Sequence, residues 1–161
     1  LAYYASASPL IVDDICVVQL GGKKSGAIIA FDLTDGTEVW RSTDDPPAYA
    51  SPALMTVDNQ KLIVALTAQN LVGISVDEGL LLWQTPFAPG RMGTNSATPV
   101  IHGDAVIISG QKRGTTAIRI KKSDGQFAAT ELRNNTDVST AFNTPVLTDV
   151  GRVTVRTPVT H

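Results

Sequence analysis

The chain has 161 residues, a formal charge of −2 and a hydrophobic fraction of 43%, which suits one domain with a substantial core. A net charge so near zero argues against nucleic acid as the main partner, and no apolar run reaches the roughly 18 residues that a transmembrane helix needs. Because Cys16 is the single cysteine, an internal disulfide is excluded. The first residues carry no signal-peptide pattern, and we expect the sequence to begin inside a longer chain.

Short apolar runs separated by turns follow one another along the chain. In the first unit they cover residues 9–12, 15–20, 27–33 and 37–42. The second unit has runs at 52–57, 61–66, 71–76 and 80–85, and the third has runs at 99–102, 105–110, 115–121 and 126–132. Val, Ile and Leu dominate these runs, and no segment keeps a helical period, so we expect strands throughout.

The units recur with a nearly constant period. Trp40 and Trp83, the two tryptophans of the chain, lie 43 residues apart. A small hydroxyl residue also precedes a proline at the start of each unit, and these prolines are spaced by 43, 47 and 46 residues. The four dipeptides are Ser8-Pro9, Ser51-Pro52, Thr98-Pro99 and Thr144-Pro145. Two independent markers that share one register indicate an internal repeat.

Four strands in each period of about 40–50 residues are typical of a β-propeller blade. We therefore predict an all-β fold of four-stranded antiparallel blades, with about three and a half blades in a partial ring. The predicted blades cover residues 8–42, 51–85 and 98–132, and an incomplete fourth begins at residue 144. Residues 151–161 lack the apolar second strand of the earlier units, which fits either an edge strand or a truncated or altered end. An open arc leaves blade faces and strand edges bare, and this favours self-association.

A turn and a tryptophan recur at matching places in the first two units. Gly36 and Gly79 each follow an acidic residue, and we expect these pairs to close the hairpin between the third and fourth strands. Trp40 and Trp83 come four residues after these glycines, so both indoles should lie on one face of the outermost strand, stacked between blades. This arrangement predicts a packing role for the tryptophans.

Residues 30–40, AFDLTDGTEVW, resemble the tryptophan-docking motif of propellers of the pyrroloquinoline-quinone type, Ala-x-Asp-x-x-Thr-Gly-x-x-x-Trp. The matching residues are Ala30, Asp32, Gly36 and Trp40 in the first unit, and Gly79 and Trp83 in the second. The third unit has Ala129 where the tryptophan belongs. The resemblance covers about residues 8–150 and implies this propeller fold. The family includes quinoprotein dehydrogenases and a non-enzymatic branch that includes the outer-membrane-assembly propeller lipoprotein.

Residues able to carry chemistry do not form a recognisable set. The two histidines, His102 and His161, are far apart, and the chain contains no Cys-x-x-Cys pair, phosphate-binding glycine loop or Gly-x-Ser-x-Gly sequence. We expect His102 to lie in a solvated turn. A basic group around the third unit is expected to be solvated as well: Lys112, Arg113, Arg119, Lys121 and Lys122.

The resemblance implies that an enzyme of this family would need a vicinal cysteine pair, calcium-binding Glu and Asn residues and a catalytic Asp. The lone Cys16 does not fit this pattern. We therefore predict no catalytic, cofactor-binding or metal-binding residue in this chain.

The loops that join consecutive blades are the expected place for a ligand, because they line one mouth of the central channel of a propeller. Here these loops cover residues 43–51, 86–98 and 134–144. Their larger side chains form the candidate channel-mouth surface: Tyr49, Arg91, Asn95, Phe142 and Asn143.

Taken with the resemblance, these features lead us to expect a non-catalytic propeller that acts as a protein-interaction or assembly scaffold, with protein partners and no cofactor. The alternative is a fragment of a pyrroloquinoline-quinone-dependent oxidoreductase, which would use that quinone with calcium. The resemblance implies a periplasmic or secreted location under both hypotheses. One fold hosts many functions, so the fold alone does not choose between them.

Overall fold

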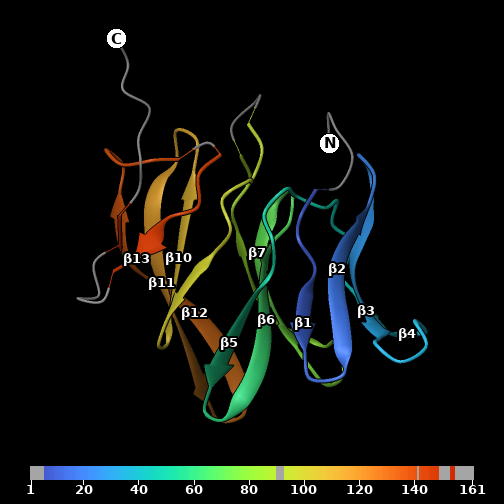
Figure 1. Cartoon of the computed structure of the whole chain (residues 1–161). Coiled ribbons are helices and arrows are strands. Elements are labelled where there is room, and N and C mark those ends of the chain that lie inside the picture. Colours follow the sequence, from blue (N-terminus) through green and yellow to red (C-terminus); the bar gives the residue numbers. More distant parts are fainter. Residues whose placement is uncertain (1–5, 90–92, 141, 149–152, 155–161) are drawn as a thin grey trace.

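The computed structural model describes residues 6–89, 93–140, 142–148 and 153–154, and within them the chain folds into strands, turns and loops. Runs rich in Val, Ile and Leu alternate with Gly, Asp and Asn turns, so each run pairs with the next through a short connection. Three four-stranded sheets lie side by side, and a two-stranded sheet follows them (Figure 1). The predicted all-β, partial propeller is confirmed.

Each blade is an antiparallel meander in which consecutive strands pair in chain order. The first blade consists of β1 (Leu10–Val12), β2 (Ile15–Gly21), β3 (Gly26–Asp32) and β4 (Glu38–Ser42). The second consists of β5 (Ala53–Val57), β6 (Gln60–Leu66), β7 (Asn70–Ser75) and β8 (Leu81–Pro86). The third consists of β9 (Val100–His102), β10 (Ala105–Gly110), β11 (Gly114–Ser123) and β12 (Gln126–Asn135). The fourth begins with β13 (Val146–Leu147) and β14 (Val153–Thr154).

The third blade is longer at its outer edge than the sequence pattern suggests. Strands β11 and β12 have ten residues each, and their ladder runs from Ser123↔Gln126 to Thr115↔Asn135, beyond residue 132. In the fourth blade, Val146 pairs with Thr154, so part of the segment 151–161 forms a strand. Residues 151, 152 and 155–161 lie outside the described residues.

The hydrophobic core lies between the blades, because successive residues of a strand point to opposite faces of its sheet. Strand β6 shows this alternation. Ile63 and Ala65 belong to the cluster shared with the first blade, whereas Leu62 and Val64 belong to the cluster shared with the third. All four side chains are fully buried, so the second blade is covered on both faces.

The hairpin between the third and fourth strands has a similar construction in the first two blades. Gly36 and Gly79 adopt positive φ values of 75° and 68° at the turn. The Asp32 carboxylate accepts a hydrogen bond from the backbone N–H two residues later, at 2.6 Å. The Ser75 hydroxyl, at the matching place, accepts one from the N–H of Leu80 at 3.0 Å. The turn is thus fixed by local hydrogen bonds in both blades.

Candidate functional site

Trp40 lies in the interface between the first two blades. Its indole N–H donates a hydrogen bond to the carbonyl oxygen of Val76 at 2.8 Å, and the side chain is buried. A Cβ atom placed on Gly79 would come within 2.6 Å of ring atom Cδ2 of Trp40, so the ring lies directly against the turn of the next blade. The cross-strand partner of Trp40 is Ala30, which is also buried.

Trp83 occupies the matching place in the next interface but packs differently. It pairs with Gly73, and a Cβ atom on that glycine would overlap the indole ring. The space around Gly125, in the turn of the third blade, is open. Among the described residues the Trp83 Nε1 atom has no hydrogen-bond partner. The Trp83 ring therefore lies over its own blade instead of against the next turn.

The dipeptides that open the blades are joined by hydrogen bonds, which we call the hydroxyl series. The backbone N–H of Ser8 donates to Oγ of Ser51 at 2.8 Å, and the N–H of Ser51 donates to Oγ1 of Thr98 at 3.2 Å. The N–H of Thr98 donates to Oγ1 of Thr144 at 3.2 Å. Each bond spans one repeat and links one blade to the next. The hydroxyl residue that recurs before each proline was the sequence signal for this link between blades. In the sequence analysis it served only as a marker of the repeat period.

Asn95, one of the candidate channel-mouth residues, lies inside the protein with 3% of its surface exposed. Its Nδ2 atom donates to the carbonyl oxygens of Thr67 at 2.9 Å and Phe87 at 2.8 Å. The backbone carbonyl oxygen of Asn95 accepts hydrogen bonds from the backbone N–H groups of Tyr49 and Ala50. Asn95 therefore ties two inter-blade loops together and does not belong to an exposed surface.

The other candidate channel-mouth residues have different surroundings. Tyr49 is half-buried and lines a small cavity of about 130 Å³ with residues of two inter-blade loops. Phe142 is 77% exposed, and Asn143 is exposed beside it. Arg91 lies outside the described residues. The binding role assigned to these residues stays a prediction.

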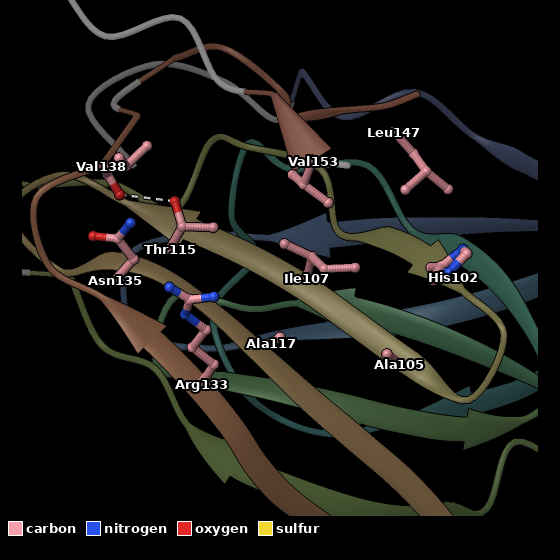
Figure 2. Close-up of a pocket in the computed structure, with 10 residues that line it drawn as sticks. All are labelled: His102, Ala105, Ile107, Thr115, Ala117, Arg133, Asn135, Val138, Leu147 and Val153. Carbon is pink, nitrogen blue, oxygen red and sulfur yellow. Dashed lines mark hydrogen bonds between the residues drawn. The ribbon is translucent and has the colours of Figure 1, made fainter. Parts of the chain in front are cut away.

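A larger cavity of about 400 Å³ lies between the third blade and the start of the fourth (Figure 2). Its lining residues are His102, Ala105, Ile107, Thr115, Ala117, Arg133, Asn135, Val138, Leu147 and Val153. Arg133 and Asn135 lie at one end and His102 at the other, with Ile107 between them. No sequence signal indicated this cavity, because its lining residues come from the third blade and from the start of the fourth.

Most of the basic group around the third blade has structural partners. The Arg113 guanidinium lies 4.9 Å from the Phe87 ring centroid, and its Nη1 donates to a loop carbonyl at 2.6 Å. Arg119 pairs with Asp104 at 3.0 Å. Lys122 donates to the Gln60 side chain at 2.8 Å. These contacts hold the third blade to its neighbours and to its own loops.

Two exposed charged groups of the first blade have shifted pKa values. The backbone N–H and then the hydroxyl of Thr37 donate to the Asp35 carboxylate, and these hydrogen bonds lower the pKa of Asp35. A side-chain hydrogen bond from Arg41 to Glu38 raises the pKa of the guanidinium. Both shifts come from contacts within one hairpin, so they stabilise the turn and do not indicate a reactive group.

The described residues contain no group of three or more His, Cys, Asp or Glu side chains that could hold a metal ion. Cys16, the free thiol, is half-buried in β2. Across the residues that the structure describes, no helix is long and apolar enough to cross a bilayer.

The repeated four-stranded blades and their inter-blade contacts define a partial β-propeller. Residues 3–157 match the family described as outer membrane protein assembly factor BamB, and the chain belongs to this family. The expected resemblance is confirmed. Among curated proteins, no significant match is found.

Two solved structures show the same fold. BamB from Moraxella catarrhalis is 18% identical with a TM-score of 0.59, and the match covers 89% of this chain and 41% of that one. A europium-containing methanol dehydrogenase is 14% identical with a TM-score of 0.50, and the match covers 80% of this chain and 25% of that one. The chain thus spans less than half the length of either protein.

Proposed function

We propose that the chain is part of a non-catalytic propeller that binds other proteins and acts as an assembly scaffold in the periplasm. The observation that carries this proposal is the match to an assembly-factor family over residues 3–157. Because this match covers nearly all of the given sequence, the assembly role named for the family is the first function to test for this chain.

The arrangement of the inter-blade loops supports a binding role. Asn95 and the hydroxyl series fix the places where the chain passes from one blade to the next. Phe142 lies in such a loop and exposes most of its ring. An aromatic side chain that is held on a rigid scaffold can bury a large apolar area in a partner, and aromatic residues dominate the binding energy of many interfaces.

Site-specific photo-crosslinking in cells tests the proposal. The complete gene product would carry a photoreactive phenylalanine analogue at Phe142, and a control would carry it at Lys121, an exposed residue of β11. We expect defined protein adducts at position 142 and few at position 121. Equal or absent adducts at the two positions would contradict a binding role for this loop.

The second candidate is a quinone-dependent oxidoreductase, and it is favoured by the structural likeness to a methanol dehydrogenase. Calorimetric titration of the complete gene product with pyrroloquinoline quinone and calcium separates the two functions. The scaffold proposal predicts no calcium-dependent binding of the quinone to the folded protein. Stoichiometric binding would overturn it and would justify assays of alcohol oxidation.

A further inference from the structure

The outer strand of the third blade, β12, has a free edge that differs from the outer edges of the other two blades. Among the described strands β12 pairs with β11 alone, just as β4 pairs with β3 alone and β8 with β7 alone. A further blade follows β4 and another follows β8, and neither blade pairs with the edge of the strand before it. A following blade therefore packs against the face of a sheet and does not pair with its outer edge.

The outer strands of the first two blades are short and interrupted. β4 has five residues and β8 has six, and in each strand a register shift beside the tryptophan breaks the ladder. β8 also ends at Pro86, which has no backbone N–H. Short strands, bulges and prolines are features by which natural sheets avoid pairing with other chains.

The first six residues of β12 lack these features. The hairpin between β11 and β12 turns at Asp124 and Gly125, which have positive φ values of 51° and 80°. Because such a two-residue turn matches the twist of the strands, the ladder is regular over residues 126–131 and shifts only beyond Glu131. These residues, QFAATE, contain no lysine, proline or glycine. We call the unpaired side of residues 126–131 the β12 edge.

The backbone groups that the β12 edge presents follow from the neighbouring strands. The N–H of Ile120 donates to the carbonyl oxygen of Asp104 at 2.8 Å, so the backbone groups of Ile120 point away from β12. Its pair with Ala129 is therefore not hydrogen-bonded, and Ala129 points its own N–H and C=O away from β11. Phe127 and Glu131 lie two residues to either side and point in the same direction. These three residues present donors and acceptors at the spacing of an antiparallel strand.

The side chains beside the β12 edge define the chemistry of a segment that could pair with it. Phe127 and Ala129 pack against the core cluster between the second and third blades, and Leu82 of β8 packs against the same cluster. Glu131 faces this side as well, since its cross-strand partner Ile118 belongs to the cluster. Glu131 is exposed and forms no ion pair with another described residue. The edge therefore fits an extended segment with apolar residues at alternate positions and a basic residue opposite Glu131.

We propose that an extended segment of a partner protein adds to the β12 edge as an antiparallel fifth strand of the third blade. The backbone groups of Phe127, Ala129 and Glu131 bind the main chain of this segment, and the apolar side chains on one face of the sheet select its alternate residues. The inference rests on the proposed function, because its occupant is a partner protein. It assigns the binding to a surface other than the loop that contains Phe142.

Binding of a synthetic peptide to the complete gene product tests this proposal. The probe is fluorescein-labelled Lys-Thr-Val-Thr-Val-Thr, whose lysine would lie opposite Glu131 and whose valines would lie opposite Ala129 and Phe127. Fluorescence anisotropy measures its dissociation constant. Methylation of the backbone nitrogen of the first valine, which would face β12, should weaken binding about tenfold. Methylation of the backbone nitrogen of the second threonine, which would face away from β12, should leave the dissociation constant unchanged.

Proline variants of the protein test the same contact from the other side. Ala129→Pro removes an outward N–H without breaking a hydrogen bond to β11, and it should weaken binding about tenfold. Arg41→Pro in β4 is the matched control and should leave binding unchanged. The N–H of Leu33 donates to the carbonyl oxygen of Asp14, so the backbone of Ile29 points to β2 as well. Arg41 pairs with Ile29, and its N–H therefore points outward from the first blade.

A charge exchange tests the register of the added strand. Glu131→Lys should weaken binding of the probe, because it places two like charges opposite each other. The same variant should bind a peptide that begins with glutamate more tightly than wild type does. Equal binding of the two peptides by wild type and by Glu131→Lys would contradict the pairing of this residue with the basic position.

Three further results would overturn the proposal. If the protein with its native circular dichroism spectrum does not bind the probe saturably, the edge does not take up an extended segment. Equal effects of the two methylations, or of Ala129→Pro and Arg41→Pro, would show that the β12 backbone is not the contact. A dimer that Ala129→Pro dissociates would show that a second copy occupies the edge. Protein adducts at position 142 together with any of these results would leave the scaffold function standing without this edge.

Discussion

Replacing Gly79 with alanine tests the interface between the first two blades most directly. Gly79 has a φ of 68°, where alanine costs roughly 1 kcal/mol more than glycine. The new Cβ would also lie 2.6–2.8 Å from three atoms of the Trp40 ring. This overpacking would displace the Trp40 ring and lower the free energy of unfolding by about a further 1–3 kcal/mol. We therefore expect Gly79→Ala to lower the free energy of unfolding by about 2–4 kcal/mol.

Gly36→Ala is the matched control for this prediction. Gly36 has a φ of 75°, close to that of Gly79, but a Cβ on it would meet no atom within 4 Å. Gly36→Ala should therefore lower the free energy of unfolding only by the backbone conformational cost, roughly 1 kcal/mol. Urea denaturation followed by tryptophan fluorescence measures both variants. Equal losses for Gly79→Ala and Gly36→Ala would refute the contact between Trp40 and the turn.

Three further predictions concern named side chains. Trp40→Phe should lower the free energy of unfolding by about 1–3 kcal/mol, because the buried carbonyl of Val76 loses its donor. Trp83→Phe should lower it by less, since the Trp83 Nε1 has no described partner. Urea denaturation compares the two variants, and a larger loss for Trp83→Phe would contradict the hydrogen bond assigned to Trp40. Asn95→Ala should lower the free energy of unfolding by about 2 kcal/mol, because the carbonyls of Thr67 and Phe87 lose their donor. It should also speed amide hydrogen exchange in the two inter-blade loops that Asn95 joins. Unchanged exchange would contradict this bridging role. The pKa of Asp35 is lowered on folding, so its stabilising effect is present above the ordinary pKa of 3.8 and is lost as the pH falls through the lower folded-state value. Wild type should therefore exceed Asp35→Asn in stability at neutral pH and lose that advantage in acid, as thermal unfolding across pH would show; a pH-independent difference would exclude this cause.

The repeat made the blades predictable from the sequence. Strand β2 was expected at residues 15–20 and covers Ile15–Gly21, and β4 was expected at 37–42 and covers Glu38–Ser42. Apolar alternation and turn residues act locally, so they identify strands without knowledge of the partner strand. The end of the third blade was less predictable, because the pairing of Thr115 with Asn135 depends on the register of two long strands.

The candidate site was less predictable than the fold. Asn95 was expected at a channel mouth because it is one of the larger side chains of an inter-blade loop. Its burial depends on where the carbonyl oxygens of Thr67 and Phe87 come to lie, which no local pattern encodes. The cavity near His102 was missed for a similar reason, since its walls come from two different blades.

The sequence by itself determined the all-β class, the repeat period and the places of the turns and tryptophans, because each of these follows from residue types at fixed spacing. Only the tertiary structure decided what those residues contact. Trp40 reaches the carbonyl of Val76 while Trp83 lies over Gly73, although both occupy the same place in the repeat. The reason is physical: spacing sets the direction of a side chain, whereas its partners depend on how closely two sheets pack and on which atoms the neighbouring blade places there.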